Sequence, residues 1–164
     1  MTRTASGASA WTFDMAKSGI HWDESMTATA AARARLPQMA QAYFKAGRKL
    51  AGAPASFHKF RLATKALRYT LELFRPCYGP ALDRRLSALA AIQDSLGAIS
   101  DCATTRELIA AKLPEGAPER IRMDSYLDAA ERRKRLEFRR YWLRTFDQPG
   151  QERLWLNYLS RPRH

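Results

Sequence analysis

The sequence predicts an all-α protein of one domain, and three observations support this class. Residues that favour helices, mainly Ala, Leu, Arg, Lys, Gln and Glu, fill long stretches of the chain. No sustained alternation of β-branched and polar residues, which would indicate strands, is found. With 164 residues, of which 46% are hydrophobic, the chain is long enough for one core, and a second domain is not expected.

Two helices are expected in the first half of the chain. The first runs over about residues 25–50, and Pro37 indicates either a kink or a break between two shorter pieces. The segment AGAPAS ends this helix, and Ser56 is positioned to cap the next one. The second helix then runs to about Arg75 and stops before PCYGP.

Four further helices are expected in the second half. Gly97 can adopt the left-handed conformation that ends a helix, so a break is predicted there, with Ser100 or Asp101 capping the helix that follows. The segments PEGAP and DQPG separate the later helices. The predicted ranges are about 81–96, 100–113, 119–146, which is the longest, and 151–159.

The N-terminal residues 1–24 differ in composition from the rest of the chain. They combine Gly, Ser and Thr with four large apolar residues, Trp11, Phe13, Ile20 and Trp22. This mixture predicts an irregular N-terminal arm whose aromatic side chains dock on another surface, for example on another chain. Residues 25–164 then form the single helical domain.

The chain is strongly basic. It has 28 Lys and Arg against 16 Asp and Glu, a formal charge of +12, which predicts an anionic partner such as nucleic acid, polyphosphate or a membrane surface. Residues 25–100 hold twelve basic and three acidic residues, so nine of the twelve excess charges lie in this segment.

A basic stripe on the second predicted helix concentrates this charge. His58, Arg61, Lys65 and Arg68 follow one another at spacings of three and four, and at about 100° per residue they fall within about 80° of the helix circumference, together with Glu72. Apolar residues flank them on both sides, whereas an ordinary surface helix has a wider polar face. Either these side chains extend past apolar surface into water, or the stripe lines a groove that binds a polyanion.

The same region resembles a repeat of the CHAD domain, the histidine-bearing α-helical domain of prokaryotes. The resemblance covers roughly residues 30–146. The family's pattern of His, Arg, a further base, Leu-Arg-Tyr and Leu-Glu-Leu-Phe is matched at His58, Arg61, Lys65, Leu67, Arg68, Tyr69, Leu71, Glu72, Leu73 and Phe74. Its later Leu-x-x-Leu-Gln-x-x-Leu-Gly pattern is approximated by Leu89, Ile92, Gln93, Leu96 and Gly97, and its usual Asn-Asp by Ser100 and Asp101.

The resemblance implies a helical-bundle module that binds inorganic polyphosphate in a basic central channel and is not itself an enzyme. No cofactor is expected. Members of the family usually carry two such repeats, related by an approximate two-fold axis, whereas this chain contains one. We therefore expect an antiparallel bundle of one repeat that a second copy completes in a homodimer, with the N-terminal arm as a clasp.

Two further groups of bases could serve the same surface. Lys45, Arg48 and Lys49 share one face of the first helix, where a solvated surface is the alternative. Arg132, Arg135 and Arg139 form one stripe of the long helix, and Arg133, Arg140 and Arg144 form another. By analogy with the family's basic last helix we favour the first stripe, although Asp128 and Glu131 could make it an ordinary salt-bridged face. Arginine suits phosphate because its planar fork donates two hydrogen bonds to one group.

Other functions remain as alternatives. Basic helices could bind RNA or DNA, but base recognition normally adds exposed aromatic side chains, and here most aromatics fall on apolar faces. A phosphate-transferring enzyme could use His58, but the sequence offers no carboxylate to orient it. No P-loop, glycine-rich phosphate cradle or ExExK motif of triphosphatases is present.

Metal sites, membrane insertion and secretion are not expected. Cys77 and Cys102 lack CxxC spacing and predict two buried free thiols, and His21 and His164 have no ligand spacing. No apolar run reaches the roughly 18 residues of a membrane span, and no signal-peptide pattern is seen. We expect a cytoplasmic protein; association with polyphosphate granules is left open by the sequence.

Overall fold

The computed structural model describes residues 26–52 and 56–163 and confirms the all-α prediction. Within these residues it contains five α-helices, one short 3₁₀ helix and no strand. In chain order the elements are α1 (Ala28–Gly52), α2 (Phe57–Leu73), η1 (Arg75–Cys77), α3 (Ala81–Lys112), α4 (Pro118–Thr145) and α5 (Gln151–Leu159). The proposed N-terminal arm, residues 1–24, lies outside the described residues.

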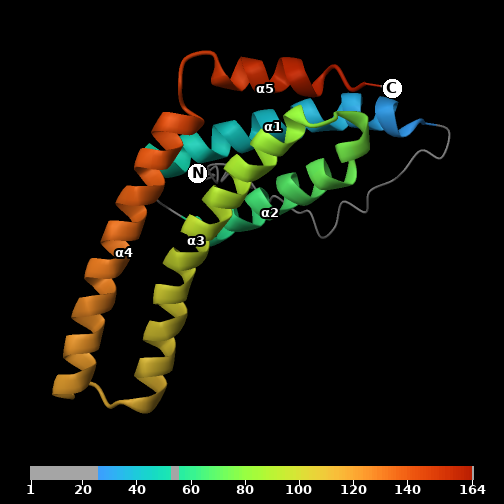
Figure 1. The fold of residues 1–164 in the computed structure, drawn as a ribbon. Coiled ribbons are helices and arrows are strands. Elements are labelled where there is room, and N and C mark those ends of the chain that lie inside the picture. The colour runs from blue at the N-terminus through green and yellow to red at the C-terminus, as the bar shows by residue number, and fades with distance from the viewer. Residues whose placement is uncertain (1–25, 53–55, 164) are drawn as a thin grey trace, which may run out of the picture.

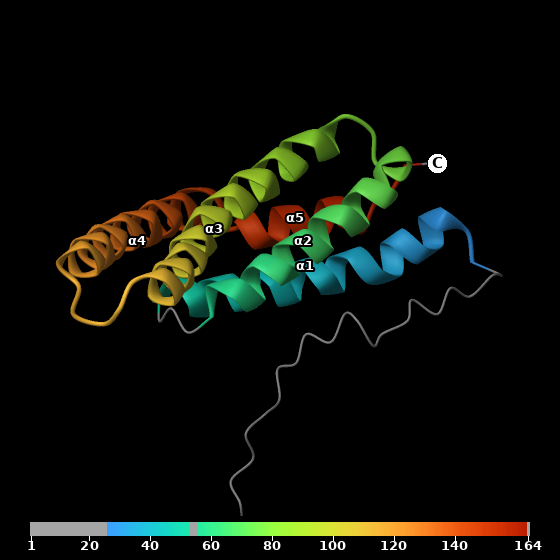
Figure 2. The same cartoon turned by 90° about the horizontal axis from the view of Figure 1, so that it is seen from below.

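The helices form an antiparallel bundle with one projecting hairpin. Helices α1, α2 and the first part of α3 pack side by side in alternating directions, and α5 lies along α1 (Figures 1 and 2). Helices α3 and α4 pair with each other along a hairpin whose far end extends away from the other helices (Figure 1). The bundle therefore holds the core, while in the described part of the chain the end of the hairpin is supported only by its own two helices.

The first two helices follow the sequence closely. Helix α1 continues through Pro37 without a break. The Ser56 side chain accepts a hydrogen bond from the Lys59 backbone N–H at 3.3 Å, so the predicted cap of α2 is confirmed. Helix α2 ends at Leu73 and the 3₁₀ helix η1 follows, which places the change of direction close to the predicted one.

The predicted break at Gly97 is wrong. Helix α3 runs for 32 residues through Gly97, which makes it longer than the 28-residue α4. The Ser100 hydroxyl donates to the Leu96 carbonyl at 3.1 Å within the helix instead of capping a new one. A continuous helix keeps Leu96 and Ile99 in the core, and this burial outweighs the roughly 0.5–1 kcal/mol cost of an internal glycine.

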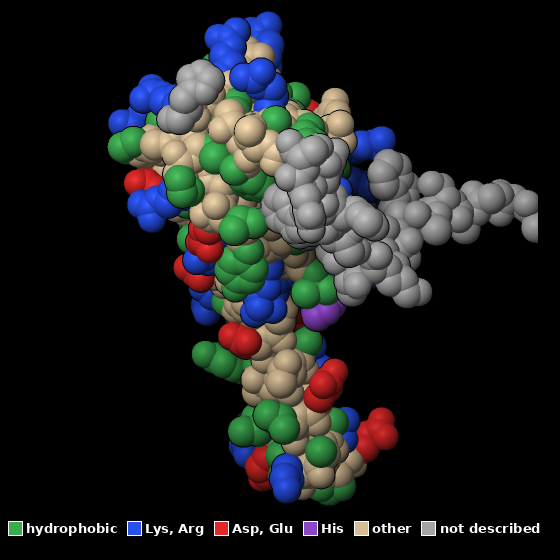
Figure 3. Space-filling model, turned by 90° about the vertical axis from the view of Figure 1, so that its right-hand side faces the viewer, with side chains coloured by type: hydrophobic (Ala, Val, Ile, Leu, Met, Phe, Trp, Pro, Cys, Tyr) green, Lys and Arg blue, Asp and Glu red, His purple; other side chains and the backbone are tan. Residues whose placement is uncertain are grey.

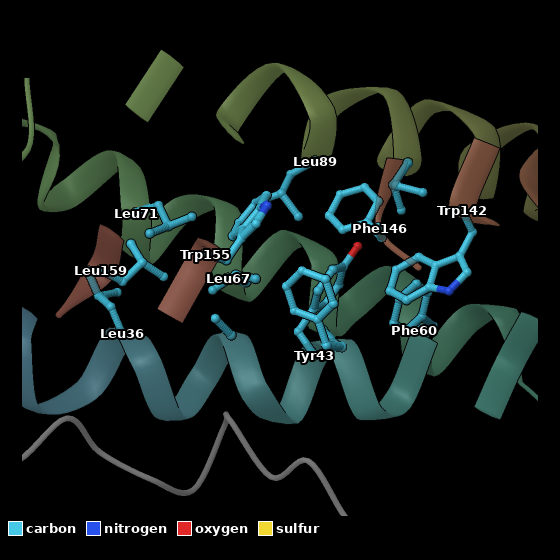
Figure 4. Close-up of a cluster of buried hydrophobic side chains, with 14 of the residues drawn as sticks. Leu36, Tyr43, Phe60, Leu67, Leu71, Leu89, Trp142, Phe146, Trp155 and Leu159 are labelled. Carbon is cyan, nitrogen blue, oxygen red and sulfur yellow. The ribbon is translucent and has the colours of Figure 1, made fainter. Parts of the chain in front are cut away.

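Aromatic side chains from four helices fill the centre of the bundle (Figure 4). Tyr43 stacks on Phe60 with ring centroids 4.8 Å apart, and Trp142 stacks on Phe146 at 4.9 Å. Trp155 of α5 packs beside Phe146 at 5.6 Å. The buried Thr64 hydroxyl donates to the Phe60 carbonyl at 2.8 Å and lies 3.3 Å from the Tyr43 hydroxyl, while burial raises the pKa of Tyr43.

Gly47 permits this packing. A Cβ at Gly47 would lie 1.9 Å from Cη2 of Trp142, far inside any contact distance. Only a glycine therefore lets α1 approach the indole of Trp142 this closely.

The C-terminal segment is tied to the turn between α2 and α3. The Tyr78 hydroxyl donates to the Leu159 carbonyl at 2.6 Å, and the Tyr158 hydroxyl donates to the Tyr78 carbonyl at 3.1 Å. Burial raises the pKa of Tyr78 to about 12. Cys77 and Cys102 are free, as expected, but each is partly exposed, so the prediction that both thiols are buried is wrong.

Candidate functional site

The basic stripe, His58, Arg61, Lys65 and Arg68, lies on the edge of α2 that adjoins α3. Arg68 Nη1 donates to Gln93 Oε1 of α3 at 3.2 Å, and Arg68 Nε pairs with Glu72 at 2.9 Å. At 1.5 Å per residue, His58 and Arg68 are separated by about 15 Å along the helix axis. The stripe is therefore a line of cations and not a single point of charge.

Most of the stripe lacks a counter-charge. Within residues 26–52 and 56–163, Arg68 alone among its members has a carboxylate partner. The Nε atom of Arg61 is buried and has no hydrogen-bond acceptor in the described part of the chain. This atom is closed to solvent, so an anionic ligand can contact only the accessible remainder of the Arg61 side chain, which is partly exposed.

The two apolar flanks of the stripe differ in burial. The flank formed by Phe57, Phe60 and Leu67 is buried in the core. The other flank is not buried in the single chain: Leu62, Tyr69 and Leu73 are 50%, 53% and 60% exposed. With the partly buried Ala66 they recur at the spacing of a helix-packing seam, so we call Leu62, Ala66, Tyr69 and Leu73 the α2 seam.

The arginines of α4 lie at the N-terminal end of α2. Arg132, Arg135 and Arg139 line a pocket of about 290 Å³ together with Leu50, Ala51, Phe57, Leu136 and Phe138. Arg135 also lines a neighbouring pocket of about 240 Å³ with Ser56, Phe57, His58, Ile99, Ser100, Ala103 and Glu131. The fold thus brings one end of the basic stripe next to the α4 arginines.

These arginines are not equivalent. Arg135 forms a short ion pair with Glu131, and Arg106 of α3 pairs with Asp128 at 2.7 Å and with Glu131 at 3.1 Å. Arg132 and Arg139 are exposed and have no acidic partner in the described residues. The face therefore contains one salt-bridged arginine, in line with the alternative interpretation, and two arginines without an acidic partner in the described residues, whose role in ligand binding stays a prediction.

Three basic residues of α1, Lys45, Arg48 and Lys49, do not share one environment. Arg48 pairs with Glu152 of α5 at 2.7 Å, on the side of α1 that α5 covers. Lys45 and Lys49 are exposed. The fold does not gather these three residues around the basic stripe in the way it gathers Arg135 and His58.

Basic and acidic residues are distributed differently in the bundle and in the hairpin. Residues 105–131, which form the far part of the hairpin, contain six acidic and four basic residues, although the whole chain has an excess of twelve bases. Figure 3 shows Lys and Arg side chains clustered at the bundle end and Asp and Glu interspersed along the hairpin. An anionic ligand is therefore attracted to the bundle.

The described residues contain no group of three or more His, Cys, Asp or Glu that could hold a metal ion. None of their helices combines the length and the apolar character that a bilayer span requires.

The sequence profile of the CHAD domain matches residues 4–110. The chain belongs to the CHAD domain family. No curated protein and no solved structure matches the chain. The CHAD match includes α1, the whole basic stripe and most of α3, whereas the α4 arginines lie outside it. It also begins before the first described residue, so the boundary between arm and domain stays a prediction.

Two parts of the site were missed from the sequence. Gln93 was recognised only as part of the CHAD pattern, and the structure gives it a role, since it holds Arg68 toward α3. The apolar floor of the larger pocket, with Phe57 and Leu136, had no sequence signal because its residues come from three separate helices.

Proposed function

We propose that this CHAD domain protein binds inorganic polyphosphate along the basic stripe of α2. CHAD is a polyphosphate-binding type of domain, and the observation that carries the assignment is the line of cations described above. Three of its members, His58, Arg61 and Lys65, have no acidic partner in the described residues. A linear polyanion can satisfy such a line with successive phosphate groups, whereas a single anion can reach only one or two of its members.

His58 and the α4 arginines extend this site at one end. His58 lies in the first turn of α2, where the helix dipole adds positive potential. Arg135 adjoins it, and Arg132 and Arg139 continue the cationic surface onto α4. Lys45, Lys49 and Arg48 act as a secondary surface, on which Glu152 already neutralises Arg48.

A second copy of the chain completes the groove. The α2 seam exposes three large apolar side chains beside the basic stripe, and exposed apolar surface of this kind is typically covered by a partner. In a two-fold dimer the seam packs on its own copy, which brings two basic stripes to the edges of one interface. Their repulsion weakens the free dimer, so polyphosphate stabilises it by binding between them.

The proposed activity is binding and not catalysis. Glu131, the carboxylate that shares a pocket with His58, is already paired with Arg106 and Arg135, so it is not placed to orient the imidazole as a base. No release of phosphate from polyphosphate is expected, with or without divalent metal ions.

Nucleic acid is the second candidate ligand, and one observation favours it. Tyr69 is 53% exposed next to the basic stripe, with the Arg68 guanidinium 5.8 Å from its ring centroid, so an unpaired base could stack there. A competition binding assay distinguishes polyphosphate from nucleic acid as the ligand. If tRNA or duplex DNA displaces long-chain polyphosphate at equal phosphate concentration, the polyphosphate assignment is wrong.

The site itself is tested with two variants that each remove three charges. Replacing Arg61, Lys65 and Arg68 by Gln should weaken polyphosphate binding by at least tenfold. In a complex dominated by charge, this corresponds to a loss of binding free energy on the order of 1 kcal/mol or less for each contact removed. Replacing Arg120, Arg122 and Arg153 by Gln should have a much smaller effect. Titrations at two salt concentrations measure both, and equal losses would show that net charge alone drives binding.

A further inference from the structure

The pocket between the end of α1, the start of α2 and α4 has a feature that polyphosphate does not explain. Its floor consists of apolar side chains, namely Leu50, Ala51, Phe57, Leu136 and Phe138, and its rim of the three α4 arginines. A polyphosphate chain is charged along its whole length and has no group that gains from contact with such a floor. A ligand that fits the whole pocket combines an apolar group with an anion.

The floor of the pocket is aromatic in part and its rim is cationic. Phe57 and Phe138 are buried and meet edge to face, with ring centroids 5.6 Å apart. The Arg135 guanidinium lies 5.0 Å from the Phe57 ring centroid. Arg132 and Arg139 have no acidic partner in the described residues, which leaves two guanidinium groups available to stack on a planar ring or to pair with a phosphate.

The size of the pocket favours a ring system. Its volume of about 290 Å³ is just below the range of small-molecule sites, roughly 300–1,000 Å³, so it can hold only a small group. A flat heterocycle suits a shallow pocket with aromatic side chains below and guanidinium groups at its edge, since bases stack on both kinds of group.

The position of the pocket connects it to the basic stripe. Phe57 and Arg135 line both this pocket and the neighbouring one, which contains His58. A phosphate chain attached to a group in the first pocket can therefore pass Arg135 and reach His58, the first residue of the stripe.

We propose that this pocket holds the base of a nucleoside polyphosphate, whose phosphate chain continues past Arg135 onto the basic stripe. The proposal rests on the proposed function, because the phosphates occupy the same stripe. The new element is recognition of a nucleoside at the end of the phosphate chain, in addition to the phosphates themselves.

A comparison of ATP with inorganic tripolyphosphate tests this proposal, because both ligands contain three phosphates and only ATP carries a nucleoside. We expect the full chain to bind ATP about tenfold more tightly than tripolyphosphate in calorimetric titrations without divalent metal, because stacking of one base adds to the phosphate contacts. Inorganic tripolyphosphate carries more charge than ATP, so charge alone predicts the opposite order.

Two leucines of α4 provide a matched pair of variants. Leu136 lines the pocket and is 53% exposed, whereas Leu143 lies two turns further along the same face, is 41% exposed and does not line the pocket. Leu136→Gln should remove most of the preference for ATP and leave tripolyphosphate binding unchanged, and Leu143→Gln should change neither. Both side chains are exposed, so both variants should keep the circular dichroism spectrum of the original protein.

The outcomes separate the two proposals. If ATP binds no more tightly than tripolyphosphate while long-chain polyphosphate still binds, the nucleoside proposal is wrong and the polyphosphate site stands. If dodecyl phosphate shows the same Leu136-dependent advantage over inorganic phosphate, the pocket accepts an alkyl chain and the assignment to a base is wrong. If none of these phosphates binds, both proposals fail.

Discussion

Replacing Gly47 by alanine should destabilise the protein, although alanine is the better helix former. The added Cβ would lie 1.9, 2.2 and 2.5 Å from three ring carbons of Trp142, whereas ordinary contacts begin at 3.4 Å. The indole cannot move away easily, because it is fully buried and contacts the rings of Phe146 at 4.9 Å and Phe60 at 5.6 Å. Helix α1 must therefore shift or the core must repack.

The expected magnitude follows from two opposing effects. Alanine in a helix interior is favoured over glycine by about 1 kcal/mol, and overpacking of a core costs about 1–3 kcal/mol, occasionally more. For an overlap as large as this one we expect the upper part of that range, hence a net loss of about 1–2 kcal/mol in the free energy of unfolding.

Gly97 provides the matched control. It is also internal to a helix, but no heavy atom lies within 4 Å of the position its Cβ would take. Gly97→Ala should therefore stabilise the protein by about 0.5–1 kcal/mol. Urea unfolding followed by circular dichroism measures both variants.

A double-mutant cycle identifies the cause. Trp142→Phe shortens the ring that meets Gly47, so Gly47→Ala should lose most of its cost in that background. The reasoning is refuted if Gly47→Ala stabilises the protein as much as Gly97→Ala does, or if its cost is the same with Phe at position 142.

Three further predictions concern pH, assembly and the hairpin. The pKa of Tyr78 is raised from about 10 to about 12, so its stabilising effect is complete below pH 10 and should be lost between about pH 10 and 12, at most about 2–3 kcal/mol. Tyr78→Phe should flatten this alkaline loss in urea titrations, whereas exposed Tyr126→Phe should not. Light scattering coupled to size exclusion should give a mass twice the 18.6 kDa of one chain when polyphosphate is present. The double variant Leu62→Glu, Leu73→Glu should give the mass of one chain under the same conditions. A mass of one chain for the original protein under all conditions would exclude the dimer. Arg106→Gln removes the bridge from α3 to Asp128 and Glu131 and should speed amide hydrogen exchange in the hairpin while leaving the bundle unchanged.

Local patterns in the sequence determined the helical class, most helix ends and the basic stripe. The Ser56 cap and the stripe depend only on residues a few positions apart, and helical geometry places such residues without knowledge of the rest of the chain. The error at Gly97 has the same origin. A glycine that could end a helix continues one here, because burial of Leu96 and Ile99 on either side outweighs its local cost.

The tertiary structure decided everything that depends on helices far apart in the sequence. The contact between Gly47 and Trp142, the meeting of His58 and Arg135, and the pairing of Arg48 with Glu152 join residues separated by 77 or more positions. The periodicity of apolar and basic residues specifies which side of a helix is apolar or basic. It does not specify which other helix that side contacts. For this reason the sequence predicted the basic stripe, whereas the apolar pocket beside it and the exposed α2 seam emerged only when the helices were packed.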